Sequence, residues 1–286
     1  MIVDGKALAA SILERLRRKI KYYSSSGDKI KLVSLNFKGS SAYLLYQRSQ
    51  RKTADYLGVD FQTFHYRNLT GKKVGKIVEE LNDNSHVHGI VIELPLPPKI
   101  KFELISDLLD YRKDVEGASV VNQGLLSLGR PFLVSPTALA CFHILKTLSP
   151  QLYGKNVTIV GASSLVGKPL AQLLLKEMAT VSVTHIATFK SGNLSRYTRQ
   201  ADILISAAGK QELITKDMVK KGAVVLDVGI NHKRGRIVGD VSEEVRRKCR
   251  YITPVPGGVG PVTTAFLFSN LLKAFLNQKG ISNVKR

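Results

Sequence analysis

Apolar side chains near the amino terminus repeat with a helical period. Leu8, Ile12, Leu16 and Ile20 recur every four residues, which places them on one face of a helix. The pattern therefore predicts an amphipathic helix over about residues 5–23.

Extended and helical patterns then alternate through the first half of the chain. Short apolar runs are typical of strands, and longer runs with a helical period are typical of helices. Repeated alternation of the two indicates a parallel sheet with crossover helices. The predicted elements are a strand at 31–37, a helix at 42–57 that ends at Gly58, a strand near 61–66, a helix at 73–81 and a strand at 89–94.

The second half of the chain repeats this alternation after a connecting helix at about 133–148. The fold class is therefore α/β with two domains, an amino-terminal α/β domain and a Rossmann-type doubly wound domain, with a cleft between them. The predicted elements of the second half are strands at 156–161, 180–186, 201–209 and 222–231, a helix at 165–178 and a last helix at about 263–276.

The bulk composition is that of a soluble globular protein. Hydrophobic residues make up 44% and charged residues 23% of the 286 positions, and no apolar run approaches the roughly 20 residues that a membrane helix needs. The amino terminus has an acidic residue, Asp4, and a helical apolar period where a signal peptide has a basic start and a continuous apolar core. We therefore expect a cytoplasmic protein with no membrane partner.

The formal net charge of +21 is the one unusual bulk property. Clustered lysines and arginines bind nucleic-acid phosphates, but the basic runs here are scattered and no nucleic-acid motif accompanies them. A nucleic-acid partner is therefore not expected. A second interpretation is that a positive cleft steers an anionic small molecule.

The two cysteines, Cys141 and Cys249, have no metal-ligand spacing around them. Neither a CxxC pair nor any other cysteine pattern of a metal site is present. The sequence therefore predicts neither a disulfide framework nor a bound metal.

A run of prolines and glycines lies near the carboxy terminus. Residues 251–264, YITPVPGGVGPVTT, contain three prolines and three glycines. Proline fixes φ and removes an amide donor, while glycine reaches backbone angles closed to other residues. We therefore predict a shaped loop that lines a ligand site, and neither ordinary helix nor strand. A plain turn-rich connector is the alternative.

A glycine-bearing loop follows the strand predicted at 156–161. Its sequence, GASSLVG at 161–167, joins a strand directly to a helix. A doubly wound sheet binds a dinucleotide pyrophosphate at this place, on free amides of the helix terminus. Gly209 and Gly229 provide more open backbone at the ends of later strands, so a nucleotide site is predicted. A strand-helix turn without a ligand is the alternative.

The identity of the nucleotide stays open. A ribose-binding acid is expected about 20 residues after the glycine loop, but the segment HIATFK at 185–190 contains neither Asp nor Glu. The glycine loop contains no arginine for a 2′-phosphate, although Lys190 lies downstream. The cofactor is therefore NADP or NAD.

These segments together resemble the methylenetetrahydrofolate dehydrogenase/cyclohydrolase family (FolD). The resemblance covers nearly the whole chain, and the joint occurrence of the motifs in the family's order and spacing is highly specific. The motifs are DGK near the start, GIVIELPLP at 89–97, KDVEG at 113–117, GASSLVGKP at 161–169, ADILISAAG at 201–209, DVGIN at 227–231, GDV at 239–241 and TPVPGGVGP at 253–261.

The resemblance implies a fold, an activity and an assembly. It implies a folate and catalytic domain at 1–138, completed by the carboxy-terminal helix at 262–286, and a Rossmann-type dinucleotide-binding domain at 139–261. It also implies oxidation of a tetrahydrofolate derivative, 5,10-methylenetetrahydrofolate, by NADP or NAD. Hydrolysis of the methenyl product to 10-formyltetrahydrofolate would follow. The family is usually a homodimer.

The catalytic helix departs from the family pattern at one position. The family has a tyrosine followed four residues later by a lysine, and these positions are Tyr46 and Gln50 here. The spacing puts both on one helix face. Glutamine neither donates nor accepts a proton at ordinary pH, so the cyclohydrolase step is in question.

Two further departures concern carboxyl groups. Glu93 stands where the family has glutamine before LPLP, and Glu116 stands where the family has the aspartate that holds the pterin. A charged residue in an apolar strand favours a function, so Glu93 joins Tyr46 and Gln50 as a catalytic candidate.

The remaining site positions come from the resemblance. Ala162 replaces the family's arginine, and Ile186 follows His185 where the family commonly has serine. The two residues that usually bind the NADP phosphate in the family are therefore absent. His185 itself is predicted to be a strand-end packing residue and not a catalyst. The cofactor positions implied are Gly161, Ala162, Ser163, Gly167 and Ile230, and the folate positions are Glu116, Pro256, Gly257 and Gly258.

Three functions are compatible with these residues. The first is a folate enzyme that retains hydride transfer, which depends on positioning more than on a titrating group. The second is a catalytically impaired relative that binds folate, nucleotide or a protein partner. The third is an enzyme that uses Glu93 as a base on a related pterin.

Overall fold

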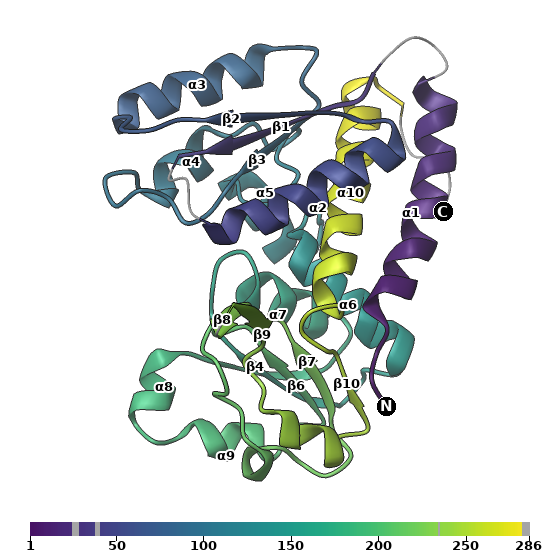
Figure 1. Cartoon of the computed structure of the whole chain (residues 1–286), viewed down its shortest axis with the longest axis vertical. Coiled ribbons are helices and arrows are strands. Elements are labelled where there is room, and N and C mark those ends of the chain that lie inside the picture. The colour runs from purple at the N-terminus through teal and green to yellow at the C-terminus, as the bar shows by residue number, and fades with distance from the viewer. Residues whose placement is uncertain (25–28, 38–40, 234, 282–286) are drawn as a thin grey trace. The chain divides into compact units, whose positions relative to one another are not determined.

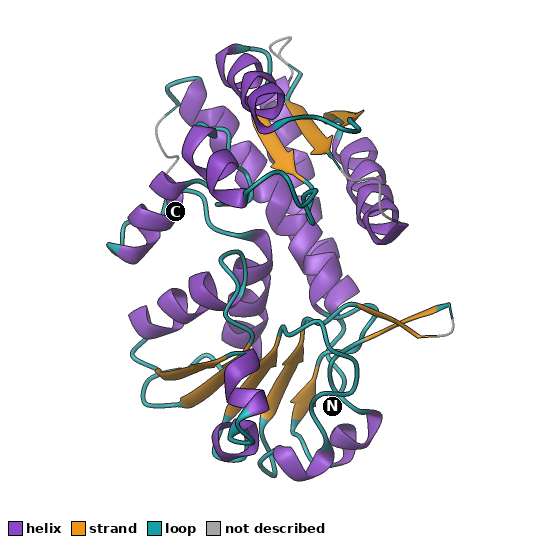
Figure 2. Ribbon diagram, turned by 90° about the vertical axis from the view of Figure 1, so that its left-hand side faces the viewer, coloured by secondary structure: helices purple, strands orange, loops and turns teal. Residues whose placement is uncertain are grey.

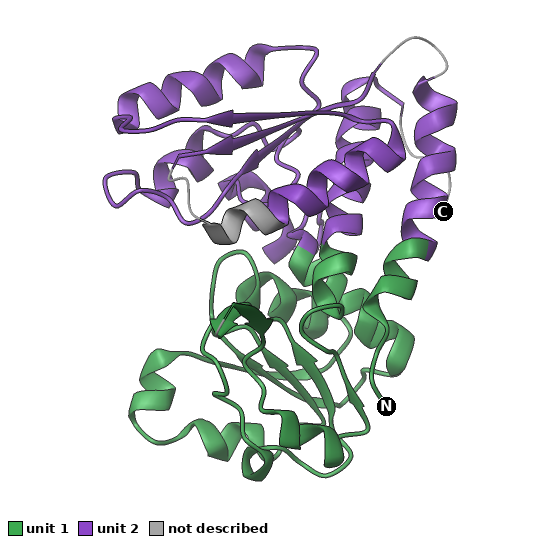
Figure 3. Cartoon of the chain, in the orientation of Figure 1, with its two compact units in different colours: residues 1–10, 137–263 green, residues 11–136, 264–286 purple. Residues whose placement is uncertain are grey.

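The computed structural model describes residues 1–24, 29–37, 41–233 and 235–281. The chain forms two compact units (Figure 3). Unit 1 comprises residues 1–10 and 137–263, and unit 2 comprises residues 11–136 and 264–286. Each unit contains a parallel sheet, so the predicted α/β class with two domains is confirmed.

Unit 2 contains a three-stranded parallel sheet in the order β2-β1-β3 (Figure 1). Parallel strands cannot be joined by a tight turn, so a helix connects each strand to the next. The strands are β1 (Lys31–Asn36), β2 (Asp60–His65) and β3 (Gly89–Ile92), and the helices are α2 (Ser41–Leu57), α3 (Gly71–Asp83), α4 (Phe102–Leu108) and α5 (Val120–Ser127).

Apolar side chains bury both faces of this sheet. Helices α3 and α4 cover one face. On the other face a side chain at Gly89 would come within 2.6 Å of Leu271 and 2.7 Å of Val115, so this glycine allows close packing against the last helix. The core of the first face is formed by Val33, Leu35, Phe37, Val74, Val78, Val87, Ile90, Ile92, Ile100, Ile105 and Leu109.

Unit 1 contains a five-stranded parallel sheet in the order β10-β7-β6-β4-β5. Figure 2 shows the strands of both units in orange. The chain leaves β4 towards β5 on one side and then returns to β6 on the other, which is the strand order of a doubly wound sheet with a switch point beside β4. The strands are β4 (Asn156–Val160), β5 (Thr180–Thr184), β6 (Ile203–Ser206), β7 (Val224–Asp227) and β10 (Tyr251–Ile252).

Helices and a hairpin complete the chain. They are α1 (Gly5–Ser24), α6 (Pro136–Leu148), α7 (Gly167–Lys176), α8 (Ile186–Lys190), α9 (Leu194–Thr198) and α10 (Val259–Gln278), the 3-10 turns η1 (Lys216–Met218) and η2 (Glu243–Arg247), and the strands β8 (Asn231–Lys233) and β9 (Arg236–Val238).

The predicted elements are confirmed, with corrected ends. The strand predicted at 180–186 stops at Thr184, because His185 accepts a hydrogen bond from the Ala187 amide at 3.2 Å and caps α8. The run at 251–264 was wrongly assigned as free of regular structure. It begins with β10, and α10 begins at Val259, because Pro261 lies in the first helical turn, where amides have no partner within the helix.

The last helix also corrects the expectation that no apolar run is long enough to span a membrane. Among the described residues, α10 meets that test by length and composition. Two-thirds of its apolar window is buried, and Phe268, Leu271 and Phe275 are fully enclosed. Its apolar character therefore belongs to the protein core.

Candidate functional site

Helix α2 places Tyr46 and Gln50 one turn apart in unit 2. Gln50 is completely buried, whereas Tyr46 is half-buried. Neither the amide nitrogen nor the amide oxygen of Gln50 has a hydrogen-bond partner among the described residues. The amide instead lies beside the Tyr46 hydroxyl and the Glu93 carboxyl, and it lowers the pKa of both groups.

Glu93 lies directly after β3, beside the carboxyl end of β1. Its backbone amide donates to the Leu35 carbonyl at 2.9 Å, and the Ser34 hydroxyl donates to its carboxyl Oε1 at 2.9 Å. The residue is only 6% exposed. Burial raises the pKa of Glu93 to about 7, while Ser34 and the nearby Gln50 amide act in the opposite direction.

Glu116 is electrostatically coupled to Glu93. Burial raises the pKa of Glu116 well above its usual value, and the negative charges of Glu93 and Asp114 add to the effect. The pKa of Tyr46 is also raised, first by burial and then by Glu116 and Glu93, while Gln50 lowers it. Four predicted residues, Tyr46, Gln50, Glu93 and Glu116, thus influence one another in an acidic cluster of unit 2, in which Gln50 and Glu93 are buried.

Asp114 belongs to the same segment but is used by the fold. Its carboxylate accepts hydrogen bonds from the amides of Ala118 and Ser119 at 2.9 and 2.8 Å, and from the Asn122 side chain at 2.8 Å. These donors fix the turn that leads into α5. Among the acids of this segment, Glu116 is therefore the one left for a ligand.

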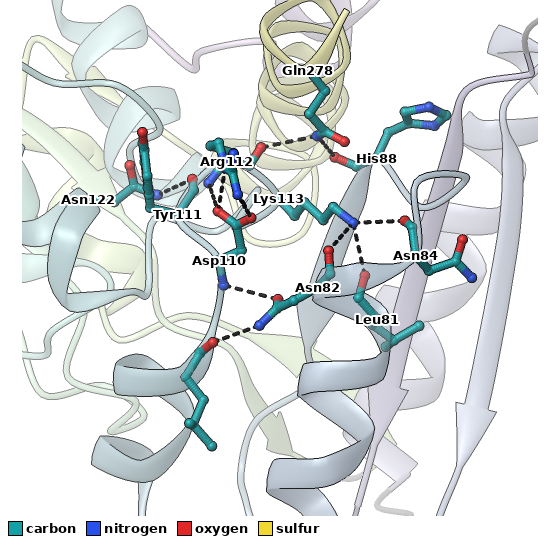
Figure 4. Close-up of polar contacts among 11 residues, drawn as sticks. Leu81, Asn82, Asn84, His88, Asp110, Tyr111, Arg112, Lys113, Asn122 and Gln278 are labelled. Carbon is teal, nitrogen blue, oxygen red and sulfur yellow. Dashed lines mark hydrogen bonds and ion pairs between the residues drawn. The ribbon is translucent and has the colours of Figure 1, made fainter.

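Lys113 holds the end of α3, as Figure 4 shows. Its ammonium group donates to the carbonyls of Leu81, Asn82 and Asn84 at 3.0, 2.5 and 2.8 Å. Cations at a helix carboxyl end satisfy carbonyls that the helix leaves unpaired. Two residues of the KDVEG motif, Lys113 and Asp114, are thus structural in this chain.

The glycine loop of unit 1 has the close packing of a nucleotide-binding turn. Gly161 has φ +121°, and a side chain there would lie 2.3 Å from the Ala207 carbonyl oxygen. A side chain at Gly167 would lie 1.8 Å from the Gly161 oxygen. Ser163 accepts the Val166 amide at 3.2 Å and helps to close the turn before α7. The loop therefore requires both glycines.

A pocket of about 270 Å³ opens beside this loop at the carboxyl ends of β4, β5 and β6. This is the switch point at which doubly wound sheets bind ligands. Gly161, Ala162 and Ser163 line the pocket, whereas Ile230 does not and is 64% exposed. The remaining lining residues are Val160, His185, Ile186, Phe189, Leu194, Ala207, Ala208, Lys210 and Leu213.

Three pocket residues correct or extend the sequence interpretation. His185 is exposed and caps α8, so its prediction as a packing residue was wrong. The Lys210 ammonium group lies 3.8 Å from the centre of the Phe189 ring. Neither Lys210 nor Phe189 carried a motif signal, because the fold alone brings the two segments together.

Asp240 organises the edge of this pocket and was missed as a functional residue. Its carboxylate accepts the amides of Ala208, Gly209 and Lys210 at 2.8, 3.2 and 2.9 Å. It also accepts the Ser206 hydroxyl and the Asn231 side chain, both at 3.0 Å. The GDV motif that contains Asp240 was recognised, but its role needed the positions of its donors.

Asp227 lies against Asp240. The amides of Gly229, Asp240 and Val241 donate to its carboxylate at 3.1, 2.9 and 3.0 Å. Burial raises the pKa of Asp227 to about 6, and the charge of Asp240 adds to this, while the three amides oppose it.

Residues Pro256, Gly257 and Gly258 form the turn before α10 in unit 1. Gly257 has φ +101°, and a side chain at Gly258 would lie 2.5 Å from the Pro254 oxygen. A side chain at Gly5 would lie 1.8 Å from the Gly258 oxygen, so this turn packs on the start of α1.

A second pocket, of about 150 Å³, lies at the opposite, amino-terminal ends of the unit 1 strands. Lys155, Lys220, Lys221 and Arg250 line it, and Lys220 is paired with Asp202 at 2.6 Å. No predicted site residue lines this pocket. The described residues also contain no group of three or more His, Cys, Asp or Glu side chains arranged for a metal ion.

The chain matches two sequence models of one family. Residues 3–116 match the catalytic domain of tetrahydrofolate dehydrogenase/cyclohydrolase, and residues 135–279 match the NAD(P)-binding domain of the same family.

Individual relatives cover almost the entire chain. The bifunctional protein FolD of Campylobacter jejuni is 43% identical over 281 residues, which are 97% of this chain and 99% of the relative. The crystal structure of the Campylobacter jejuni FolD enzyme superposes with a TM-score of 0.91, at 42% identity and 97% and 99% coverage. The Trypanosoma brucei enzyme, solved with NADP and an inhibitor, gives a TM-score of 0.90 at 33% identity, with 99% of each chain covered.

Proposed function

Since the chain belongs to the tetrahydrofolate dehydrogenase/cyclohydrolase family, we propose that it oxidises 5,10-methylenetetrahydrofolate to the methenyl compound, with NADP or NAD as hydride acceptor. The observation that carries this proposal is the pocket beside Gly161, together with the Gly161–Gly167 contact that shapes its loop. Hydride transfer requires two ligands held in register and no titrating side chain.

The pocket of unit 1 supports a dinucleotide as the hydride acceptor. The backbone at Gly161, Ala162, Ser163 and Gly167 would hold the pyrophosphate at the amino terminus of α7. The nicotinamide cofactor supplies the hydride-accepting ring when bound. We assign Ile230 a contact with the cofactor from the family resemblance, and its exposure leaves it accessible to a ligand.

The residues proposed for the folate come from the family resemblance. Glu116 would hold the pterin through its carboxyl group, and Pro256, Gly257 and Gly258 are assigned to folate binding because their turn exposes open backbone. Tyr46, Gln50 and Glu93 would face the reacting carbon. We accordingly propose a folate and catalytic domain at 1–138, completed by 262–286, and a dinucleotide domain at 139–261.

The second family activity, hydrolysis of the methenyl product, depends on how protons move. Position 50 holds a glutamine, whose amide does not titrate. The amide at position 50 therefore cannot transfer the protons that hydrolysis requires. A catalytically impaired relative that binds folate or nucleotide is the second candidate function, favoured by the substitutions at Gln50, Glu93, Glu116 and Ala162.

We further propose a cytoplasmic homodimer with a small-molecule folate substrate and no nucleic-acid partner. Strand β5 is at the end of the unit 1 sheet and pairs with β4. Val183 on this strand and Leu175 and Met178 beside it expose apolar surface. An open strand edge with apolar neighbours favours pairing with a second copy.

A spectrophotometric assay tests the proposed function. Purified protein would be mixed with 5,10-methylenetetrahydrofolate and either NADP or NAD, and formation of the reduced cofactor would be followed. Turnover with either nucleotide supports the dehydrogenase. Thermal stabilisation by folate or nucleotide without any turnover would instead support the binding relative.

A further inference from the structure

The pocket beside the glycine loop of unit 1 is lined by basic side chains and by no acidic one. Lys210 and His185 are among its lining residues, and none of the described residues that line it is an aspartate or a glutamate. A dinucleotide pocket that selects NAD holds a carboxylate for the ribose 2′-hydroxyl, whereas a cation at that place accommodates a 2′-phosphate. The lining of this pocket therefore favours a ligand with a 2′-phosphate.

The ammonium group of Lys210 reaches the side of the pocket where a bound ribose would lie. Its nitrogen is 3.8 Å from the centre of the Phe189 ring, and Phe189 belongs to α8, the helix that follows β5. In doubly wound sheets, the group that contacts the ribose 2′ position stands near the end of the second strand. Strand β5 is that strand in unit 1. Lys210 therefore comes from the loop after β6 but places its charge beside the end of β5.

No carboxylate neutralises this cation within the part of the chain that the structure describes. The Lys210 amide donates to the Asp240 carboxylate at 2.9 Å, but Asp240 is completely buried. Glu212 is paired with the Lys233 ammonium group at 3.0 Å. The Phe189 ring attracts the Lys210 ammonium group through its negative face without offering an acceptor atom, so the ammonium group keeps N–H donors for an anion.

His185 supplies a second donor in the same pocket. Its ring nitrogen Nδ1 accepts the Ala187 amide at 3.2 Å, so the ring carries a proton on Nε2 and Nε2 is a hydrogen-bond donor. His185 directly follows β5 and is exposed. It therefore stands at the position from which a doubly wound sheet contacts the ribose 2′ position.

We propose that Lys210, held on the Phe189 ring, and His185 bind the 2′-phosphate of NADP and make this chain prefer NADP to NAD. This inference rests on the proposed dehydrogenase function, because it concerns the hydride acceptor of that reaction. Both residues determine specificity and neither takes part in hydride transfer. They compensate, from other positions in the sequence, for the arginine and serine that are absent at Ala162 and Ile186.

The decisive experiment measures the binding of three adenosine phosphates by titration calorimetry at one fixed ionic strength. The ligands are adenosine 2′,5′-bisphosphate, adenosine 3′,5′-bisphosphate and adenosine 5′-phosphate. The wild type should bind the 2′,5′-bisphosphate about 10-fold or more tightly than either of the others, because a charge-assisted hydrogen bond to the phosphate forms only there. The 3′,5′-bisphosphate carries the same charge at another position, so it separates a built site from general attraction by the net charge of +21.

A matched set of lysine variants assigns the preference to one residue. Lys210→Met removes the charge and keeps an unbranched side chain beside Phe189. It should weaken the 2′,5′-bisphosphate and NADP about 10-fold or more, and change the affinity for adenosine 5′-phosphate less than about 2-fold, which would also show that the variant folds. Lys210→Arg should keep the preference. Lys190→Met removes a neighbouring lysine that does not line the pocket and should change none of the three affinities.

A histidine variant tests the second donor. In His185→Asn the side-chain oxygen can still accept the Ala187 amide and cap α8, but the Nε2 donor is lost. The preference for the 2′,5′-bisphosphate should fall about 3-fold or more. In the oxidation assay, Lys210→Met should raise KM for NADP and leave kcat unchanged, because it removes binding shared by the ground state and the transition state.

The outcomes distinguish this site from the proposed function. Equal affinity for the two bisphosphates, or a 2′-phosphate preference that Lys210→Met leaves unchanged, would overturn the site, while oxidation with either nucleotide would leave the dehydrogenase standing. Absence of reduced-cofactor formation with both nucleotides would contradict the proposed function, and failure of all three adenosine phosphates to bind would overturn both. Loss of the preference in Lys210→Met, with adenosine 5′-phosphate still bound, supports the site.

Discussion

Each unit contains two acidic residues in its candidate site, and the two sets differ in their hydrogen-bond donors. Asp227 and Asp240 of unit 1 accept eight hydrogen bonds between them, six from backbone amides and two from side chains. The donors around Glu93 and Glu116 of unit 2 are the Ser34 hydroxyl, the Gln50 amide and the Ile92 amide. The first pair is saturated, whereas the second retains free acceptor positions.

The comparison shows that burial alone does not give a carboxyl group a function. Donors that point at a carboxylate stabilise its charge and hold the surrounding backbone, as they do around Asp240. A carboxyl with few donors is easily protonated and holds no loop in place. It is therefore available for a ligand or for proton transfer.

The largest effect is expected from removing the saturated acceptor. Asp240→Ala would leave the amides of Ala208, Gly209 and Lys210 without their partner and should lower the free energy of unfolding by at least about 3 kcal/mol. It should also abolish nucleotide-dependent thermal stabilisation. Urea unfolding measures the first and thermal shift measures the second. Glu116→Ala is the matching truncation in unit 2 and should cost about 1 kcal/mol or less, because few donors lose a partner. An equal loss of unfolding free energy in both variants would contradict the difference between the two sets of carboxyl groups.

The pH dependence of stability should reveal the unsaturated pair. Below about pH 4.5 Glu93 is protonated in the folded and unfolded chains alike. Between pH 4.5 and about 7 the unfolded chain ionises first, so the folded state loses up to about 3 kcal/mol as pH rises. Urea unfolding at several pH values should show that Glu93→Gln removes this part of the fall. If Glu93→Gln left the pH dependence of the free energy of unfolding unchanged, the raised pKa of Glu93 would be contradicted.

A neutral replacement of Asp227 should have an intermediate effect. Its carboxylate accepts three amides, and an asparagine side chain offers one oxygen and places an amide group opposite a donor. Asp227→Asn should therefore lower the free energy of unfolding by about 1–3 kcal/mol at pH 8. Denaturant unfolding at pH 5 should show a smaller loss, because the native Asp227 with its pKa near 6 is then protonated as well.

The smallest effect is expected at Ser34. Ser34→Ala removes the hydroxyl donor of Glu93 and should raise the pKa of that carboxyl further, with a stability change of about 1 kcal/mol. Urea unfolding at several pH values should show that the fall in stability with rising pH extends to higher pH than in the wild type. Thr63→Ala, a hydroxyl deletion on the neighbouring strand β2 away from Glu93, serves as the control. An unchanged pH dependence of unfolding would show that the Ser34 hydroxyl does not affect the ionisation of Glu93.

The sequence predicts the longer helices and strands because the periodicity of their apolar residues can be seen in consecutive positions. The four-residue repeat of α1 and the β-α alternation led to the correct fold class. Local contacts were harder to predict. His185 looked like the end of a strand, but its ring nitrogen accepts the Ala187 amide and starts a helix. Such a capping interaction competes with strand pairing without changing the apolar pattern.

Site residues could be predicted from the sequence where steric constraints allow only one residue type at a position. Gly161 and Gly167 were identified from the strand-loop-helix order, and the short backbone approaches explain why both are glycines. Asp240 and Ser34 were not identified, because a carboxylate or hydroxyl gains its role from donors and acceptors that are distant in sequence. Ser34 is 59 positions from Glu93, and only the strand register brings the two together.

The unpartnered amide of Gln50 also has a consequence for inhibitor selectivity. A relative with lysine at this position offers a cation that attracts acidic compounds. This chain offers one neutral donor and one neutral acceptor beside a carboxyl group with free lone pairs. A compound that presents an amidine or aminopyrimidine to Glu93 and a carbonyl to Gln50 would therefore gain contacts here and meet repulsion in the lysine-bearing enzymes.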